Sequence, residues 1–222
     1  MKISVIGLGY IGLPTSAALA SRGTRVLGVD LNTHFVDEIN AGRVPIVEPD
    51  LDAAVEKAVA DGMLTASTQV EAADAFLIAV PTPFKGEHEP DLSYIESAVS
   101  SIAPVLQPGN IVILESTSPA GTTRKIAEWL AQARPDLTFP HDHESPDVFV
   151  AHCPERVLPG RVGQGRAQVG VLLDEARRPA GTEARHVLPH EDLGVAVGAG
   201  PDADGGDGQL RGDLGGQRGR DH

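Results

Sequence analysis

Apolar runs of strand length alternate with amphipathic stretches of helical period over roughly the first 160 residues. The predicted strands are Ile3–Ile6, Val26–Val29, Leu64–Ala66, Ala75–Val80, Ile111–Glu115 and Val148–Ala151. The predicted helices between them are Tyr10–Arg22, Thr33–Ala41, Leu51–Asp61, Ser93–Val105 and Thr122–Arg134. Because strands without a polar face must be covered on both sides, this alternation predicts an α/β fold with a doubly wound, mostly parallel sheet.

A glycine-rich turn joins the first predicted strand to the first predicted helix. Gly7, Gly9 and Gly12 fit the pattern G-x-G-x-x-G at this point. In such a turn the first glycine permits the tight bend, the second lets a pyrophosphate approach the backbone, and the third lets the helix pack close to the strand. The N–H groups and the dipole at the start of the helix favour a phosphate. The turn therefore predicts a Rossmann-type, dinucleotide-binding fold.

Asp30 strengthens this interpretation. It follows the second predicted strand about 20 residues past the glycines, where an acidic side chain binds the hydroxyls of the adenosine ribose. A carboxylate at this position repels the 2′-phosphate of NADP, so NAD is the expected cofactor. The alternative is a strand–helix–strand unit that binds no ligand, because glycine-rich turns by themselves are common.

Charge and cysteine content narrow the classes of function. The chain of 222 residues has a formal net charge of −13 and a single cysteine, Cys153. The acidity argues against a nucleic-acid-binding surface, which should be basic. One cysteine excludes an intrachain disulfide framework and a multi-cysteine metal site, and we expect no bound metal. No apolar run is long enough to span a membrane, and Met1 and Lys2 lead straight into a strand without a signal peptide, so the expected location is the cytoplasm.

Polar motifs follow three of the later predicted strands. They are Val80–Phe84, with the sequence Val-Pro-Thr-Pro-Phe, the hydroxyl-rich stretch Glu115–Thr122, and His152–Arg156, with the sequence His-Cys-Pro-Glu-Arg. The polar stretch Lys85–Pro90 after the first motif is expected to be a long loop. Ligands in doubly wound sheets bind beyond the carboxyl ends of the strands, so the three motifs are candidate site segments.

Each motif also has a purely structural interpretation. The proline motif could be no more than a stiff turn, and Asp91 or Ser93 could cap the helix after it. The hydroxyls of the second motif could cap the following helix, or they could hold a water or a substrate. Glu155 could form a surface ion pair with Arg156, or it could act as an acid or base.

The composition changes sharply beyond about residue 161. No Lys, Ile, Phe, Tyr, Trp or Met occurs from Arg161 to His222, and Gly, Asp and Arg dominate. Such a segment buries too little apolar surface to offset the entropy lost on ordering. We therefore expect an NAD-binding Rossmann domain over residues 1–161 and a largely disordered tail over residues 162–222. Asp202–Asp207 resembles a calcium loop but lacks the closing glutamate.

Five segments, taken in order, resemble the UDP-glucose/GDP-mannose dehydrogenase family of nucleotide-sugar 6-dehydrogenases. They are Ser4–Pro14, Ile46–Asp50, Ala79–Lys85, Ile113–Pro119 and Cys153–Gly160. The sequence Pro-Glu-Arg-Val-Leu-Pro from Pro154 to Pro159 favours the branch that acts on UDP-N-acetyl-D-mannosamine, since the UDP-glucose branch typically has Pro-Glu-Phe-Leu there. The proline and Cys-Pro-Glu-Arg motifs count against other Rossmann dehydrogenases, such as those for 6-phosphogluconate or hydroxyacyl substrates.

The resemblance implies a reaction and a set of site residues. Members of the family oxidise the C6 alcohol of a nucleotide sugar to a carboxylate in two hydride transfers to NAD, for surface polysaccharide biosynthesis. The intermediate is held on a cysteine thiol and released by hydrolysis. The resemblance implies that Thr117 positions a catalytic water and that Glu155 assists the hydrolysis. Residues that it implies in NAD binding are Gly7, Gly9, Tyr10, Ile11, Gly12, Asp30, Thr82 and Thr117.

The chain also departs from the family pattern. Members of the family are much longer and continue into a central helix that forms the contact of a homodimer. A further domain carries the nucleophilic cysteine and binds the UDP-sugar. The shared motifs stop near residue 162 here, and Cys153 belongs to the Cys-Pro-Glu-Arg motif and is not that nucleophile. We therefore expect a truncated nucleotide-sugar dehydrogenase with an incomplete substrate site or, as the alternative, a catalytically inactive NAD-binding fragment.

Overall fold

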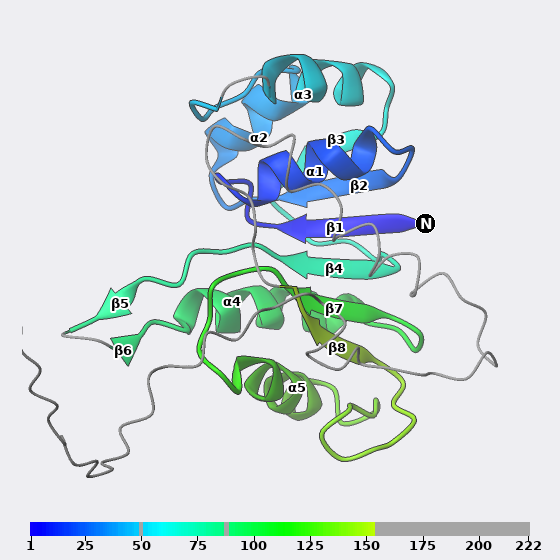
Figure 1. The fold of residues 1–222 in the computed structure, drawn as a ribbon. Coiled ribbons are helices and arrows are strands. Elements are labelled where there is room, and N and C mark those ends of the chain that lie inside the picture. Colours follow the sequence, from blue (N-terminus) through cyan, green and yellow to red (C-terminus); the bar gives the residue numbers. More distant parts are fainter. Residues whose placement is uncertain (49–50, 87–88, 154–222) are drawn as a thin grey trace, which may run out of the picture. The chain divides into compact units, whose positions relative to one another are not determined.

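The computed structural model describes residues 1–48, 51–86 and 89–153. In this part of the chain six strands form one parallel sheet in the order β3-β2-β1-β4-β7-β8 (Figure 1). The strands are β1 (Lys2–Ile6), β2 (Arg25–Val29), β3 (Leu64–Ser67), β4 (Ala75–Ile78), β7 (Ile111–Leu114) and β8 (Phe149–His152). This is the strand order of the Rossmann fold, in which the order reverses between β1 and β4. The predicted fold class is confirmed.

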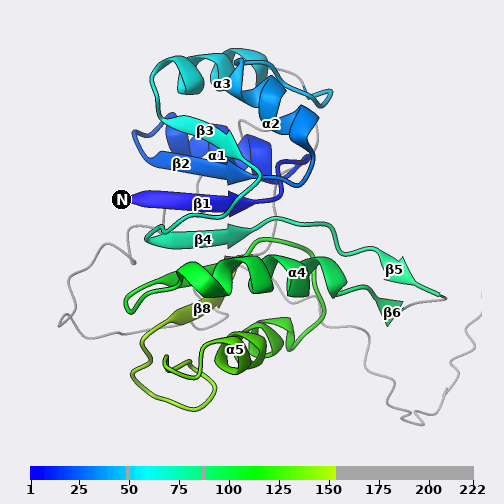
Figure 2. The ribbon, with the colours of Figure 1, turned by 180° about the vertical axis from the view of Figure 1, so that it is seen from behind.

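Helices cover both faces of the sheet (Figures 1 and 2). Their bounds are α1 (Gly12–Ala20), α2 (Thr33–Asn40), α3 (Leu51–Ala60), α4 (Ser93–Ile102) with the 3-10 turn η1 (Ala103–Val105), and α5 (Thr122–Ala133). Strand β4 shows how the faces divide: Ala75 and Leu77 pack with residues of α1 and α3, whereas Phe76 and Ile78 pack with residues of α4 and α5. All four side chains are buried, which explains why this strand reads as a continuous apolar run.

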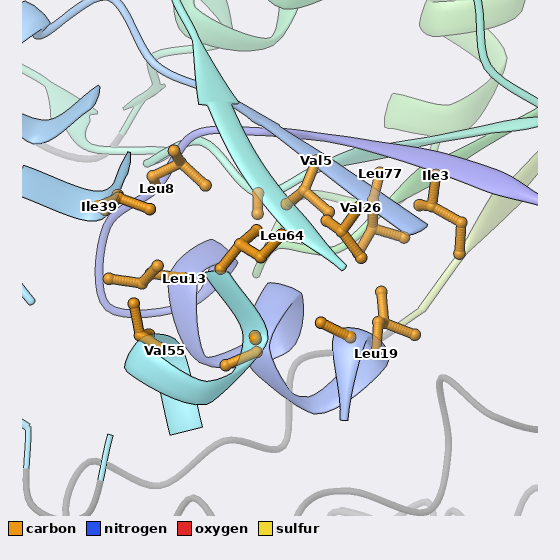
Figure 3. Packing of buried hydrophobic residues seen from close by; sticks show 14 of the residues in the cluster. Ile3, Val5, Leu8, Leu13, Leu19, Val26, Ile39, Val55, Leu64 and Leu77 are labelled. Carbon is orange, nitrogen blue, oxygen red and sulfur yellow. The ribbon is translucent and has the colours of Figure 1, made fainter. Parts of the chain in front are cut away.

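The core that supports α1 is drawn from all the elements around it (Figure 3). Ile3 and Val5 of β1 lie in one buried cluster with Leu13 of α1 and Val55 of α3. Each of the four side chains is at most 1% exposed. Burying one such side chain stabilises the folded state by about 1.5–3 kcal/mol. This packing fixes the start of α1 against the end of β1, which is where the glycine turn lies.

The predicted elements are all present in the described residues, with shifts of one to three residues at their ends. Two expectations were wrong. The stretch Lys85–Pro90 is not simply a loop, because β5 (Phe84–Lys85) and β6 (Glu89–Pro90) pair as a short antiparallel hairpin. The helix expected over residues 93–105 ends at Ile102 and continues only as η1, because Pro104 has no N–H to donate in an α-helix.

Within the three described ranges, none of the helices combines the length and the apolar character needed to cross a lipid bilayer.

Candidate functional site

The predicted site residues that the structure describes all follow the carboxyl ends of strands. The glycine turn follows β1, Asp30 follows β2, Thr82 lies beyond β4, and Thr117 lies beyond β7. Because these strands are parallel neighbours, their carboxyl ends meet at one edge of the sheet (Figure 1). Glu155 lies outside the described residues.

The three glycines of the turn differ in what a side chain would meet. Gly7 has a φ of +94°, and a Cβ there would lie 2.7 Å from the carbonyl oxygen of Ala79. A Cβ on Gly12 would lie 1.8 Å from the carbonyl oxygen of Gly7, so no other residue fits without moving the helix. A Cβ on Gly9 would meet nothing within 4 Å. Packing therefore requires Gly7 and Gly12, whereas Gly9 faces open space.

The start of α1 is not capped by a side chain. Its N-cap residue is Ile11, which makes no side-chain cap hydrogen bond, and the first turn holds no acidic residue. In α2, by contrast, Asn32 accepts a hydrogen bond from the N–H of His34 at 3.0 Å. An uncapped helix start offers its N–H groups and partial positive charge to an anion. Tyr10 stands beside it with 56% of its surface exposed.

Asp30 braces the glycine turn. One carboxylate oxygen accepts a hydrogen bond from the backbone N–H of Leu8 at 2.8 Å, and the other accepts one from the N–H of Asn32 at 2.9 Å. A carboxylate has about four acceptor sites, so two contacts leave capacity for further donors such as ribose hydroxyls. The Asp30 side chain is half-buried, which keeps it within reach of a ligand.

Thr82 and Thr117 are brought together, although 35 residues separate them. The hydroxyl of Thr82 donates a hydrogen bond to the carbonyl oxygen of Thr117 at 2.5 Å. Thr82 is half-buried and Thr117 is exposed. The contact ties the segment after β4 to the turn after β7, and it places two hydroxyl-bearing residues at the same edge as the glycine turn.

The hydroxyls after β7 do not cap the next helix, so that structural interpretation was wrong for the described residues. The N-cap of α5 is Gly121, which makes no side-chain cap hydrogen bond, and the hydroxyl of Thr122 donates back to the carbonyl oxygen of Pro119 at 2.7 Å. The four residues from Ser118 to Gly121 separate Ser116 and Thr117 from the helix. We name the segment Glu115–Ser118 the hydroxyl turn.

Two side chains from other elements contact the hydroxyl turn: Thr15, which sequence analysis did not single out, and His152, which opens the third polar motif. Thr15 of α1 donates a hydrogen bond from its hydroxyl to Oε1 of Glu115 at 3.2 Å, and both residues are at most 5% exposed. His152, at the end of β8, has its Nε2 3.2 Å from the carbonyl oxygen of Ser116. The sequence signal for Thr15 was weak, since it is only a threonine on the buried side of a helix.

An ion pair fixes the β5–β6 hairpin. Lys85 Nζ lies 2.7 Å from Oδ1 of Asp91, which also accepts a hydrogen bond from the N–H of Ser93 at 2.9 Å. These contacts lower the pKa of Asp91 from its ordinary 3.8 to about 2, and the hydrogen bond from the Lys85 ammonium has the largest effect. The predicted capping role of Asp91 is met in part, since its carboxylate holds the first N–H of α4 although Leu92 is the N-cap residue.

A row of contacts therefore runs along the carboxyl edge from strand to strand. The contacts join neighbours in the sheet order: Asp30 with Leu8, Ile6 with Ala79, Thr82 with Thr117, and Ser116 with His152. The arrangement provides a backbone cradle for a diphosphate beside a carboxylate for a ribose, and hydroxyl groups across the point where the strand order reverses.

Comparisons with known proteins agree with this geometry. Residues 1–168 match the model of the UDP-glucose/GDP-mannose dehydrogenase family, NAD binding domain. The UDP-N-acetyl-D-mannosamine dehydrogenase of Escherichia coli K12 is 66% identical over 161 residues, which are 72% of this chain and 38% of that protein. The NDP-N-acetyl-D-galactosaminuronic acid dehydrogenase of Ralstonia nicotianae is 63% identical over the same length and the same shares.

A solved structure gives the same result for the fold. The UDP-N-acetyl-mannosamine dehydrogenase of Staphylococcus aureus superposes with a TM-score of 0.68 at 40% sequence identity, covering 74% of this chain and 38% of that one. This chain thus spans less than two-fifths of the length of each of these three relatives. The match to the family model covers more than half of this chain. The chain belongs to the UDP-glucose/GDP-mannose dehydrogenase family and contains that family's NAD-binding domain.

Proposed function

We propose that this chain binds NAD at the carboxyl edge of its sheet, as the NAD-binding part of a nucleotide-sugar 6-dehydrogenase that acts on UDP-N-acetyl-D-mannosamine. The observation that carries the proposal is the open space at Gly9, in front of an uncapped helix start and next to Asp30. An uncapped helix start with room for a ligand suits a diphosphate, and an acid one strand away suits the ribose beyond it.

The residues at this edge fit NAD. Gly7, Gly9 and Gly12, with the N–H groups of Tyr10 and Ile11, would hold the pyrophosphate. Asp30 would accept hydrogen bonds from the adenosine ribose while it keeps its bond to the Leu8 N–H, and its negative charge would repel the phosphate of NADP. When bound, NAD supplies the acceptor for the hydride that leaves the sugar C6 carbon.

The hydroxyl turn is the proposed reactive end of the site. Thr82 would lie on the nicotinamide side, and Thr117 would lie near the nicotinamide and position the water for hydrolysis. The hydrogen bond from Thr82 to the Thr117 carbonyl supports these roles, because it fixes the backbone of Thr117 without using the Thr117 hydroxyl, and Thr117 is an exposed residue. Glu155, as acid or base for the hydrolysis, remains a proposal on the sequence motif alone.

The sugar is proposed on narrower grounds. Relatives named for N-acetylmannosamine and N-acetylgalactosaminuronic acid are 66% and 63% identical to this chain, so overall identity does not separate the two substrates. The motif from Pro154 to Pro159 favours N-acetylmannosamine. We also propose that the NAD-binding domain ends at residue 161. An NAD-binding domain without turnover of its own is the second candidate, since the match to the family model is a match to its NAD binding domain.

Two measurements on the 222-residue chain test the proposal. Calorimetric titration should give saturable binding of NAD and much weaker binding of NADP, because Asp30 opposes the 2′-phosphate. The absorbance of NADH then measures turnover with UDP-N-acetyl-D-mannosamine. The same assay with the C2 epimer of this sugar, UDP-N-acetyl-D-glucosamine, gives the comparison. Turnover of the first sugar alone supports the full proposal, whereas NAD binding without turnover supports the second candidate. Absence of NAD binding contradicts both.

A further inference from the structure

Thr15 and Glu115 form a buried contact between the two ends of the candidate site. Thr15 lies one turn into α1, and its N–H donates to the carbonyl oxygen of Ile11, the N-cap residue, at 3.1 Å. Its hydroxyl donates to Oε1 of Glu115 at 3.2 Å across 100 residues of sequence. The two residues are 5% and 3% exposed, so little water competes for this hydrogen bond.

Glu115 is the first residue of the hydroxyl turn and is held on its other side by the sheet. Its backbone N–H donates to the carbonyl oxygen of Ile78 at 2.8 Å, which continues the ladder between β4 and β7. Ser116, which follows, is 2% exposed, and its hydroxyl has no hydrogen-bond partner in the described part of the chain. Thr117 is tied to Thr82 through its carbonyl oxygen. The side-chain contact to α1 is therefore made two residues before Thr117.

This placement links the glycine turn to the hydroxyl turn. A ligand on the start of α1 restrains the helix end that carries Ile11 and Thr15, and the Thr15 hydroxyl passes that restraint to Glu115. A hydrogen bond to a carboxylate in a buried site is stronger than one between neutral groups in water. A packed region with such a bond transmits a restraint because it has few alternative arrangements.

We propose that Glu115 is a positioning residue, which couples the diphosphate cradle on α1 to the hydroxyl turn and so orders Thr117 when NAD binds. This inference rests on the proposed function for the identity of the ligand. It gives a role to Glu115, a buried acid that takes no part in the proposed chemistry. Glu115 acts through Thr117, and it touches neither the cofactor nor the sugar in this role.

Hydrogen exchange of the 222-residue chain, followed by mass spectrometry with and without NAD, tests the coupling. In the ligand-free chain, Thr15→Val should make the amides of residues 116–118 exchange about tenfold faster, the size expected from losing one hydrogen bond to a carboxylate. Thr15→Ser keeps the hydroxyl and should restore the parent rates. Glu115→Gln keeps an acceptor but removes the charge, so its exchange rates should fall between those of the parent and those of Thr15→Val. If Thr15→Val does not fold, Thr15→Ala takes its place.

NAD gives the readout that a merely structural role would not change. In the parent, NAD should slow exchange both at residues 8–13 and at residues 116–118. In Thr15→Val, it should still slow exchange at residues 8–13 but no longer at residues 116–118. Protection of both segments in this variant, or unchanged ligand-free rates at residues 116–118, would overturn the coupling. Absence of NAD protection at residues 8–13 in the parent would instead overturn the proposed function, while the ligand-free rates still decide the coupling.

Thr138 and Asp147 provide a control pair with the same threonine-to-carboxylate bond, which is half-buried and in which the Thr138 hydroxyl also accepts the N–H of Asp147 at 2.8 Å. The Thr138 hydroxyl donates to a carboxylate oxygen of Asp147 at 2.7 Å, and Asp147 accepts the N–H of Gly109 on its carbonyl oxygen at 2.7 Å. Both Gly109 and Asp147 precede the first residues of their strands, so this pair lies at the amino edge of the sheet. Thr138→Val should speed exchange near residues 138–148 and leave residues 116–118 unchanged. An equal effect on both segments would mean that the Thr15 result reports general loosening and would contradict the coupling.

Discussion

The glycine turn after β1 and the hydroxyl turn after β7 join a strand to a helix at the same edge of the sheet, but they are built differently. The glycine turn depends on missing side chains: Gly7 and Gly12 have no room for a Cβ, and Gly9 leaves space in front of α1. The hydroxyl turn depends on side chains from elsewhere, since Thr15 and Thr82 reach it from α1 and from the segment after β4.

The difference fits the roles that we propose for the two ends of the site. A diphosphate is held by backbone N–H groups, so its site needs a fixed backbone and an absence of obstruction. A turn that positions a reacting group needs contacts that lock it from several directions. The glycine turn can therefore be recognised from a local pattern, whereas the contacts of the hydroxyl turn appear only once the chain has folded.

The largest expected effect comes from Gly12→Ala. Its Cβ would lie 1.8 Å from the carbonyl oxygen of Gly7, so α1 must move away from the turn. Overpacking of this kind in a rigid backbone contact should lower the free energy of unfolding by about 3 kcal/mol. Urea denaturation measures the loss. Gly9→Ala is the matched control and should stay within about 0.5 kcal/mol of the parent, because its Cβ meets nothing within 4 Å. Equal losses of stability in the two variants would contradict the claim that packing requires a glycine at position 12 but not at position 9.

Asp30→Asn tests the ribose end of the glycine turn. The substitution removes the negative charge and weakens the hold on the Leu8 N–H, so NAD affinity should fall about tenfold, as expected for a hydrogen bond to a charged group. The preference for NAD over NADP should shrink at the same time, because the repulsion of the 2′-phosphate is lost. Titrations of both cofactors measure the ratio. Asp37→Asn, an exposed acid on α2, should change neither value. An unchanged ratio in Asp30→Asn would contradict the ribose assignment.

Thr82→Val tests the hydroxyl turn from the side of β4. Loss of the 2.5 Å hydrogen bond to the Thr117 carbonyl should lower the free energy of unfolding by about 1 kcal/mol. The volume of the side chain is nearly unchanged, so packing contributes little. Thr82→Ser keeps the hydroxyl and should lose less than half as much. If the serine variant is as unstable as the valine variant, the methyl group and not the hydroxyl holds the two segments together.

The smallest expected effect is a pH dependence of the stability of the β5–β6 hairpin. The Lys85 ammonium and the Ser93 N–H hold the pKa of Asp91 at about 2, below its ordinary 3.8. A lowered folded-state pKa gives stability that is complete above 3.8 and is lost as the pH falls from 3.8 through about 2. Exchange of the hairpin amides should therefore rise in this window relative to the rest of the sheet. Asp91→Asn should show no such rise, and a rise of the same size in that variant would assign it to other groups.

The fold was largely predictable because its strands are buried on both faces. β1, β4 and β7 have few polar positions, and their lengths and the helical periods between them leave few alternatives. The β5–β6 hairpin was missed because its two-residue strands are exposed and carry no apolar alternation. The hairpin forms through the Lys85–Asp91 pair and backbone bonds, for which no periodic signal exists.

The site was predictable in its positions and less so in its contacts. Strand ends located the glycine turn, Asp30, Thr82 and Thr117, and the resemblance supplied their expected roles. The pairing of Thr15 with Glu115 spans 100 residues, and nothing local in either segment indicates it. Such contacts depend on the angle at which a helix packs on the sheet, which a sequence pattern does not specify.

The central claim is that the open space at Gly9 is where a dinucleotide binds, and one paired titration tests it. NAD should bind the 222-residue chain at a single saturable site. It should bind Gly9→Ala at least about tenfold more weakly, a difference of about 1.4 kcal/mol, while both proteins unfold at the same urea concentration. Equal NAD affinity in the two proteins would contradict the claim, because the added methyl group would then occupy space that the cofactor does not use.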